Sequence, residues 1–278
     1  MFRDASDPGP SPLALLAGVA ADSLGYHSAA MSFYEDSRKE NEADEYAMTH
    51  LMISYLRQGH DKMSNAVAPL RKKLPSFIVS SVDYVLSTSV GMKPSMHYFT
   101  YDMLKLALEN TSIDMEEEAG LILEFGVYHG KTIRMIASYF PNDPVHGFDT
   151  FSGIPEDWHN TGVGSYSTFG ILPEAPDNVK YHIGLFSETL SEFLSTHPGP
   201  IRLMNIDCDL YSSTKDVFDV VADRVRPGTV IIFDEYVMNP HWENDEFKAF
   251  QEAVVKYGWE YKYLGISLVS QQAVIQII

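Results

Sequence analysis

The stretch that decides the fold is residues 121–135, LILEFGVYHGKTIRM. Its first five residues are apolar except for Glu124, which is typical of a buried β-strand, and a helical pattern follows over 131–139. Between them, Gly126 and Gly130 flank a tight turn. Glycine permits positive φ and lets the backbone approach a ligand closely, so the turn favours nucleotide binding, although a plain strand-to-helix turn has the same pattern. Glu124 is a candidate either for holding an amino group or for ordering the loop.

Short apolar runs alternate with helical patterns along the rest of the chain after residue 120. Besides the first strand and helix, we expect strands at 145–148, 179–183, 201–206, 229–233, 261–264 and 273–278, and helices at 186–196, 213–225 and 243–257. Strands that alternate with helices predict an α/β fold with a doubly wound, mostly parallel sheet of seven strands. The last two strands are close in sequence, which suits an antiparallel pair at the sheet edge.

The part before this alternation has a different character. Residues 1–12 are polar and rich in proline, and we expect a disordered tail. Residues 13–96 are expected to form a helical cap, and residues 97–278 the α/β domain. The expected cap helices are 13–39, with a break near 23–25, then 42–57, and 66–86 with an interruption at Pro75. The cap is interpreted as a substrate lid, a dimerisation surface for a homodimer, or an element that only packs on the core.

Composition excludes several partners. The formal net charge is −18, with 20 basic and 38 acidic residues. Nucleic acids and anionic membranes need clustered Lys and Arg, so neither is expected as a partner. A single cysteine, Cys208, rules out an intramolecular disulfide. No signal-peptide pattern is found, and the apolar run 13–21 is too short to span a bilayer, so we expect a cytoplasmic protein.

The second strand ends at an acidic residue, Asp149, which lies 23 positions after Gly126. Ligands of open α/β sheets bind beyond the carboxyl ends of the strands, and a carboxylate at this place can accept hydrogen bonds from both ribose hydroxyls of an adenosine. A surface aspartate at a strand end is the plainer alternative. The turn after the first strand lacks the full G-x-G-x-x-G spacing, which counts against a nicotinamide-dependent oxidoreductase.

Four carboxylates follow two other strands. Asp207 and Asp209 come after 201–206, and Asp234 and Glu235 come after 229–233. If these strands are neighbours, the acids converge, and like charges so close would raise one another's pKa. A hard divalent cation such as Mg²⁺ would resolve the repulsion, because it prefers oxygen ligands. As an alternative for one of the four, Asp209 would cap the following helix.

A long loop, residues 151–173, follows the second strand (FSGIPEDWHNTGVGSYSTFGILP). Loops of this length inside a compact domain tend to be lids or binding loops. Trp158, Tyr166 and Phe169 are candidates for excluding water or stacking on an acceptor. An ordinary surface insertion is the alternative.

The motifs EFGVYHGKT, GFDTFSGIPEDW, IDCDLYSST and FDEY, in this order, resemble the class I S-adenosylmethionine (SAM)-dependent methyltransferases. Within that class they resemble the macrocin O-methyltransferase-like family, over residues 98–278. The resemblance implies a Rossmann-like methyltransferase fold, SAM as cofactor, and Mg²⁺ or another divalent cation. It places the cofactor at Gly126, Gly130, Asp149 and the segment from Gly184 to Phe186, and the metal on Asp207, Asp234 and Glu235. The family more often has Asp-Asp at the acidic pair, so Glu235 is a departure.

The function implied is a SAM-dependent, Mg²⁺-assisted methylation of a hydroxyl on a small polar molecule, a sugar or natural product. Asp207, Asp209 and His241 are the candidates for taking the hydroxyl proton. The alternative is a catalytically silent interaction module with the methyltransferase fold, whose helical N-terminus recruits a partner.

Overall fold

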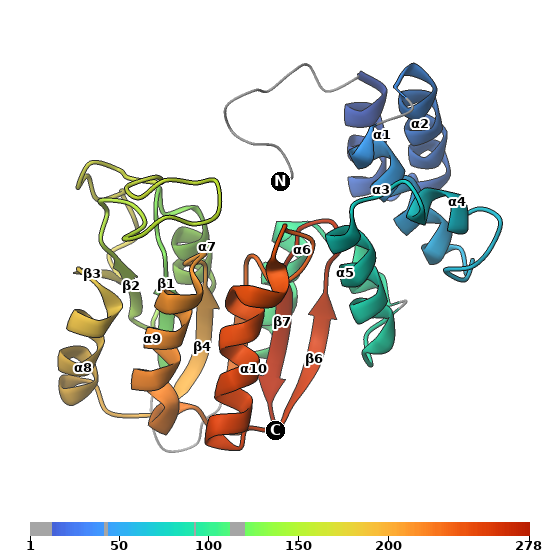
Figure 1. Cartoon of the computed structure of the whole chain (residues 1–278). Helices are drawn as coiled ribbons and strands as arrows, with labels where there is room; N and C mark the ends of the chain where they lie inside the picture. Colours follow the sequence, from blue (N-terminus) through green and yellow to red (C-terminus); the bar gives the residue numbers. More distant parts are fainter. Residues whose placement is uncertain (1–12, 42–43, 92, 112–119) are drawn as a thin grey trace.

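The computed structural model describes residues 13–41, 44–91, 93–111 and 120–278 (Figure 1). The expected tail, residues 1–12, lies outside this part of the chain. A central sheet with helices on both faces occupies the second half, and a group of helices extends to one side of it (Figure 1).

The sheet has seven strands in the order β3-β2-β1-β4-β5-β7-β6. Their bounds are β1 Leu121–Phe125, β2 Val145–Asp149, β3 Val179–Ile183, β4 Ile201–Ile206, β5 Val230–Phe233, β6 Tyr261–Ile266 and β7 Ala273–Ile277. The first five strands pair in parallel, and β7 runs antiparallel to both β5 and β6. The predicted doubly wound, mostly parallel sheet with an antiparallel edge pair is therefore confirmed.

Helices cover both faces of the sheet. Helices α6 (Thr100–Asn110) and α7 (Lys131–Tyr139) lie on one face, and α8 (Phe186–Thr196), α9 (Tyr211–Val221) and α10 (Glu246–Tyr257) lie on the other (Figure 1). Short 3₁₀ helices are η1 Pro94–His97, η2 Ala222–Arg224 and η3 Trp242–Asn244. Helix α6 has no counterpart among the elements expected from the sequence.

Strand β1 contributes side chains to two separate cores, because successive side chains point to opposite faces of a sheet. Ile122 of β1 is buried with Met103 of α6 and Ile133 of α7. Its neighbour Leu123 is buried in the other core, to which Phe250 of α10 belongs. This burial on both faces explains why β1 is almost continuously apolar.

The first half of the chain is helical, as expected. The helices are α1 Leu13–Ser23, α2 His27–Glu40, α3 Glu45–Arg57, α4 Ala68–Arg71 and α5 Ser76–Ser87. The predicted break near 23–25 falls between α1 and α2, where Gly25 has a positive φ of 80°. Pro75 lies immediately before α5, so it separates α4 from α5 as expected. Residues 42–43, the expected start of the third helix, lie outside the described residues.

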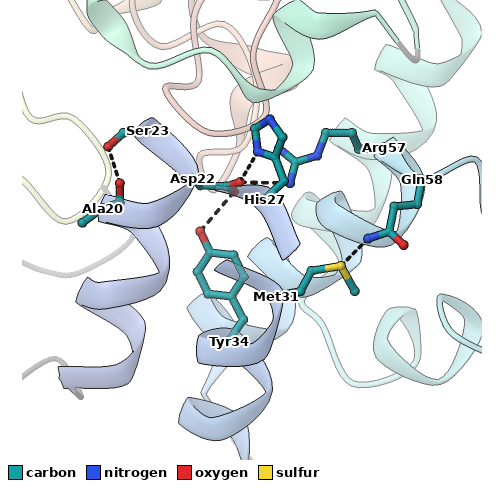
Figure 2. Close-up of polar contacts among 8 residues, drawn as sticks. All are labelled: Ala20, Asp22, Ser23, His27, Met31, Tyr34, Arg57 and Gln58. Carbon is teal, nitrogen blue, oxygen red and sulfur yellow. Dashed lines mark hydrogen bonds and ion pairs between the residues drawn. The ribbon is translucent and has the colours of Figure 1, made fainter. Parts of the chain in front are cut away.

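A single carboxylate joins the first three helices (Figure 2). Asp22 accepts hydrogen bonds from Arg57 of α3 at 2.9 Å and from the Tyr34 hydroxyl of α2 at 3.2 Å, and it shares a third with His27 at 2.8 Å. Burial alone would raise the pKa of Asp22, but these three hydrogen bonds lower it overall. Asp22, which lies just before the break between α1 and α2, therefore contacts both α2 and α3.

Helix α5 packs against the α/β domain. The Ser81 hydroxyl accepts a hydrogen bond from the Met238 backbone N–H at 2.8 Å, and the Tyr84 and Tyr263 hydroxyls are 2.5 Å apart. The core around α8, α9 and α10 continues into the cap helices. Across the described ranges, none of the helices combines the length and apolar character needed to cross a lipid bilayer.

Candidate functional site

Strands β2 and β3 lie on one side of β1, and the strands from β4 onward lie on the other side. Ligands of open α/β sheets bind where the strand order reverses in this way, here between β1 and β4. The register aligns the carboxyl ends of β2, β1, β4 and β5. The residues at these aligned ends are Asp149, Gly126, Asp207 and Asp234. The structure therefore brings the predicted cofactor turn and the predicted acidic residues to one edge of the sheet.

Asp149 orders the turn after β1. One carboxylate oxygen accepts the backbone N–H groups of Val127 and Tyr128, both at 2.8 Å, and the other accepts that of Phe151 at 2.7 Å. A carboxylate offers about four lone-pair positions, so three backbone donors leave room for about one more. We expected Asp149 to accept hydrogen bonds from both ribose hydroxyls of an adenosine. The structure shows in addition that Asp149 holds the glycine turn, which the sequence did not predict.

A cleft of about 400 Å³ opens at this edge, within the range of pockets that hold small ligands. Its lining joins the turn after β1, the end of β2, the loop after it, the start of α8 and the acidic strand ends. Of the predicted residues, it includes Gly126, Asp149, Tyr166, Gly184, Phe186, Asp207, Asp209, Asp234 and Glu235.

The remaining predicted cofactor residues lie beside the cleft. Glu124 is 1% exposed, and its carboxylate accepts a hydrogen bond from the Ile133 backbone N–H in the first turn of α7. Of its two proposed roles, this contact favours ordering the loop, and burial raises its pKa well above the usual value. Gly130 precedes α7 with φ of 71°, a left-handed conformation that glycine adopts without strain.

The charges of neighbouring carboxylates raise the pKa of three of the four acids at the cleft. Burial first, then the charges of Asp234 and Asp209, raise the pKa of Asp207 well above its usual value. Burial and the charge of Asp234 raise the pKa of Asp209 to about 7 and that of Glu235 to about 8. Within the described residues, no Lys, Arg or His forms an ion pair with any of the four. The cleft therefore gathers four acidic side chains without an ion-pair partner among the described residues.

This donor set fits a hard divalent cation, which prefers carboxylate oxygens. Searched over the described part of the chain, however, no group of three His, Cys, Asp or Glu side chains is arranged so that it could hold a metal ion. A cation bound by Asp207, Asp234 and Glu235 would have to draw their side chains together.

Two buried polar side chains that the sequence analysis missed contact the acidic strand ends. Gln272, before β7, donates a hydrogen bond to Asp234 at 2.5 Å. Glu246, the first residue of α10, accepts hydrogen bonds from the backbone N–H groups of Cys208 and Glu235. No spacing rule marks either residue, because both act through contacts between elements distant in the chain.

The loop 151–173 forms hydrogen bonds within itself. It is also hydrogen-bonded to two other parts of the chain. Ser212 of α9 donates a hydrogen bond to Glu156 at 2.5 Å. Near η3, Asp245 accepts one from the Trp158 indole at 3.3 Å and shares another with His159 at 2.8 Å.

The three aromatic residues predicted to shield the site have different surroundings. Tyr166 lines the cleft, and burial and the charges of Asp209 and Glu235 raise its pKa. Trp158 faces Asp245, and Phe169 is 91% exposed.

Two further predictions concern residues near the acids. Helix α9 begins at Tyr211 and has Leu210 at its N-cap without a side-chain hydrogen bond, so the alternative in which Asp209 caps it is wrong. His241 does not line the cleft; it is exposed and stacks on His159, with 4.6 Å between ring centroids.

Comparison with known proteins bears on the identity of this domain. Residues 123–236 match the family described as "Methyltransferase domain". The chain is 25% identical over 185 residues to the 8-demethyl-8-(2,3-dimethoxy-alpha-L-rhamnosyl)-tetracenomycin-C 4'-O-methyltransferase of Streptomyces olivaceus. That alignment covers 56% of this chain and 64% of the relative, so the chain spans less than two thirds of the relative's length.

Two solved structures are also similar. The calicheamicin methyltransferase CalS11 aligns with a TM-score of 0.49 and 21% identity, over 78% of this chain and 94% of CalS11. The O-methyltransferase NovP aligns with a TM-score of 0.44 and 19% identity, over 84% of this chain and 99% of NovP.

The matched segment runs from β1, through the glycine turn and the aligned strand ends, to the residue after Glu235. The resemblance to methyltransferases predicted from the motifs is therefore confirmed over residues 123–236, the part of this chain that matches the methyltransferase domain.

Proposed function

We propose that this chain is a SAM-dependent O-methyltransferase that acts on a hydroxyl of a small polar molecule, a sugar or a natural product. The observation that carries the proposal is the cleft that joins the glycine turn after β1 to four carboxylates after β4 and β5. The curated relative supports the hydroxyl acceptor, because its name describes 4'-O-methylation of a rhamnosyl compound.

The proposed cofactor side of the cleft is Gly126, Asp149 and the segment from Gly184 to Phe186. Gly126 lets the backbone approach the ligand, and Asp149 has capacity for one ribose hydroxyl beyond its backbone donors. Gly184 and Phe186 line the same cleft and would frame the adenine. Glu124 and Gly130 would shape the turn from behind.

The proposed acceptor side is acidic. When bound, SAM supplies an electrophilic methyl group on a sulfonium, and Mg²⁺ or another divalent cation lowers the pKa of a hydroxyl near it. Asp207, Asp234 and Glu235 would hold the cation. Asp209 would take the proton that the acceptor hydroxyl loses when its oxygen is methylated.

Asp209 suits this role better than the other candidates. It lines the cleft, and a pKa of about 7 matches a general base that works near neutral pH. Asp207 is already assigned to the cation, and His241 lies outside the cleft lining.

Residues 13–96 and 97–278 are proposed as the helical cap and the SAM-binding domain. A homodimer formed through the cap and a cytoplasmic location stay predictions.

Calorimetry with SAM, then with NADH, tests the cofactor. We expect SAM to bind and NADH not to bind; binding of neither would favour the catalytically silent interaction module. A panel of hydroxyl acceptors, assayed before and after treatment with EDTA, tests the chemistry. Full activity after removal of the metal would contradict the cation and leave the methyl transfer standing.

A further inference from the structure

Glu246 occupies an unusual position for a carboxylate. It is 0% exposed, lies at the first position of α10, and is not among the residues that line the cleft. One oxygen accepts the backbone N–H of Cys208 at 3.4 Å, and the other accepts that of Glu235 at 3.3 Å. One side chain from a third element therefore bridges the segments that follow β4 and β5.

The hydrogen bonds of Glu246 join the segments after β4 and β5 beyond the point where the pairing of these two strands stops. The ladder between β4 and β5 stops at Ile206 and Phe233, and its last backbone contact is the hydrogen bond from Asp234 N–H to the Ile206 carbonyl. Among the backbone hydrogen bonds of the described residues, none joins 207–210 to 234–238. Beyond the ladder, Glu246 supplies hydrogen bonds to both segments.

The surroundings make a carboxylate costly at this position. Burial and the charges of Asp234 and Asp209 disfavour ionisation of Glu246. Apolar packing would avoid that cost but would leave the N–H donors of Cys208 and Glu235 without an acceptor, which is unfavourable away from water. A glutamine has a single acceptor oxygen and would satisfy one of them. Only a side chain with two acceptor oxygens and this reach satisfies both.

We propose that Glu246 is a positioning residue, which holds the backbone after Asp207 and at Glu235 so that both carboxylates face one cation site. The inference rests on the proposed function, because it gives the cation-holding acids a shared support. Glu246 acts through the backbone and touches neither acceptor nor cofactor.

The test compares Glu246→Gln, Glu246→Asp and the control Glu243→Gln in the full chain. Glu243 is exposed and lies three residues earlier, so its variant removes the same charge without touching either N–H. Calorimetry measures binding of MgCl₂ alone and of S-adenosylhomocysteine alone. Amide hydrogen exchange measures protection at Cys208 and Glu235.

We expect Glu246→Gln to weaken Mg²⁺ binding roughly ten- to a hundredfold, as loss of a group that orients metal ligands does. Binding of S-adenosylhomocysteine should change less than twofold, and the Cys208 and Glu235 amides should exchange faster. Glu246→Asp keeps the charge but is one methylene too short to reach both donors, so it should show the same losses. Glu243→Gln should behave like the wild type.

Several results would overturn the inference. One is unchanged Mg²⁺ affinity in Glu246→Gln when the wild type binds Mg²⁺, which leaves the proposed function intact. Retained affinity in Glu246→Asp would show that charge, and not the bridge, matters. If the wild type binds no Mg²⁺, the cation part of the proposed function fails, and the amide exchange still decides whether Glu246 holds both segments. If neither variant folds, unprotected Cys208 and Glu235 amides in the wild type would contradict the bridge.

Discussion

The carbonyl oxygen of Asp207 occupies the place where a side chain at Gly126 would begin. A Cβ built on Gly126 would lie 1.7 Å from that oxygen, and Gly126 itself has a φ of 86°. The glycine turn after β1 and the first acidic residue after β4 are therefore in direct backbone contact. The two halves of the proposed site cannot shift independently.

Gly126→Ala is expected to separate these two segments. A left-handed conformation costs an ordinary residue about 1–2 kcal/mol, and the overlap with Asp207 adds to that cost. We expect a lower thermal midpoint and loss of S-adenosylhomocysteine binding, measured by calorimetry. Gly228→Ala is the control, because Gly228 has φ of 100° but a Cβ added to it would meet nothing within 4 Å. Equal effects of the two variants would show that the contact with Asp207 is unimportant.

Asp149→Asn tests the carboxylate that orders the turn. The amide keeps one acceptor oxygen and turns donors toward N–H groups that Asp149 now accepts, so the turn should loosen. We expect S-adenosylhomocysteine to bind roughly tenfold more weakly, a loss of about 1.4 kcal/mol. Asp177→Asn, on an exposed loop, should leave binding unchanged. Wild-type affinity in Asp149→Asn would refute this role.

Protonation of a buried histidine should make stability depend on pH. His146 is 5% exposed, and burial, with the neighbouring charge of His182, lowers its pKa from 6.5 to about 4. Between these values the unfolded chain binds a proton that the folded protein does not. The stabilisation is therefore complete above pH 6.5 and is lost as the pH falls toward about 4, by up to ~3 kcal/mol.

Urea unfolding at pH 7 and pH 5 measures this dependence. His146→Gln should reduce the difference in unfolding free energy between the two pH values, whereas His60→Gln, at an exposed position, should not. The same pH dependence in His146→Gln as in the wild type would mean that other groups cause it.

The loop 151–173 is expected to loosen when its contact near η3 is removed. Asp245→Ala eliminates the hydrogen bonds to Trp158 and His159. Limited proteolysis within the loop should become several-fold faster, and KM for the acceptor should rise while SAM affinity stays the same. Glu243→Ala is the exposed control. If deletion of residues 160–168 left acceptor affinity unchanged, the loop would be an ordinary surface insertion.

The sequence by itself determined the order of the elements after residue 120 and the positions of most candidate site residues. Residues 121–135 predicted β1, the turn and α7 because hydrophobic period and glycine act locally along the chain. Alternation of strands and helices then determined the sheet, since consecutive parallel strands need a crossover. Asp149, Asp207 and Asp234 could be placed because each directly follows a predicted strand.

Only the tertiary structure decided how these residues are held. The support from Glu246 and Gln272, the use of Asp149 by three backbone donors, and the fit of Gly126 against Asp207 all join segments far apart in the chain. Such contacts depend on strand register and on the packing of α10 against the sheet. Local propensity carries no information on either, because a buried polar group is specified by its distant partners.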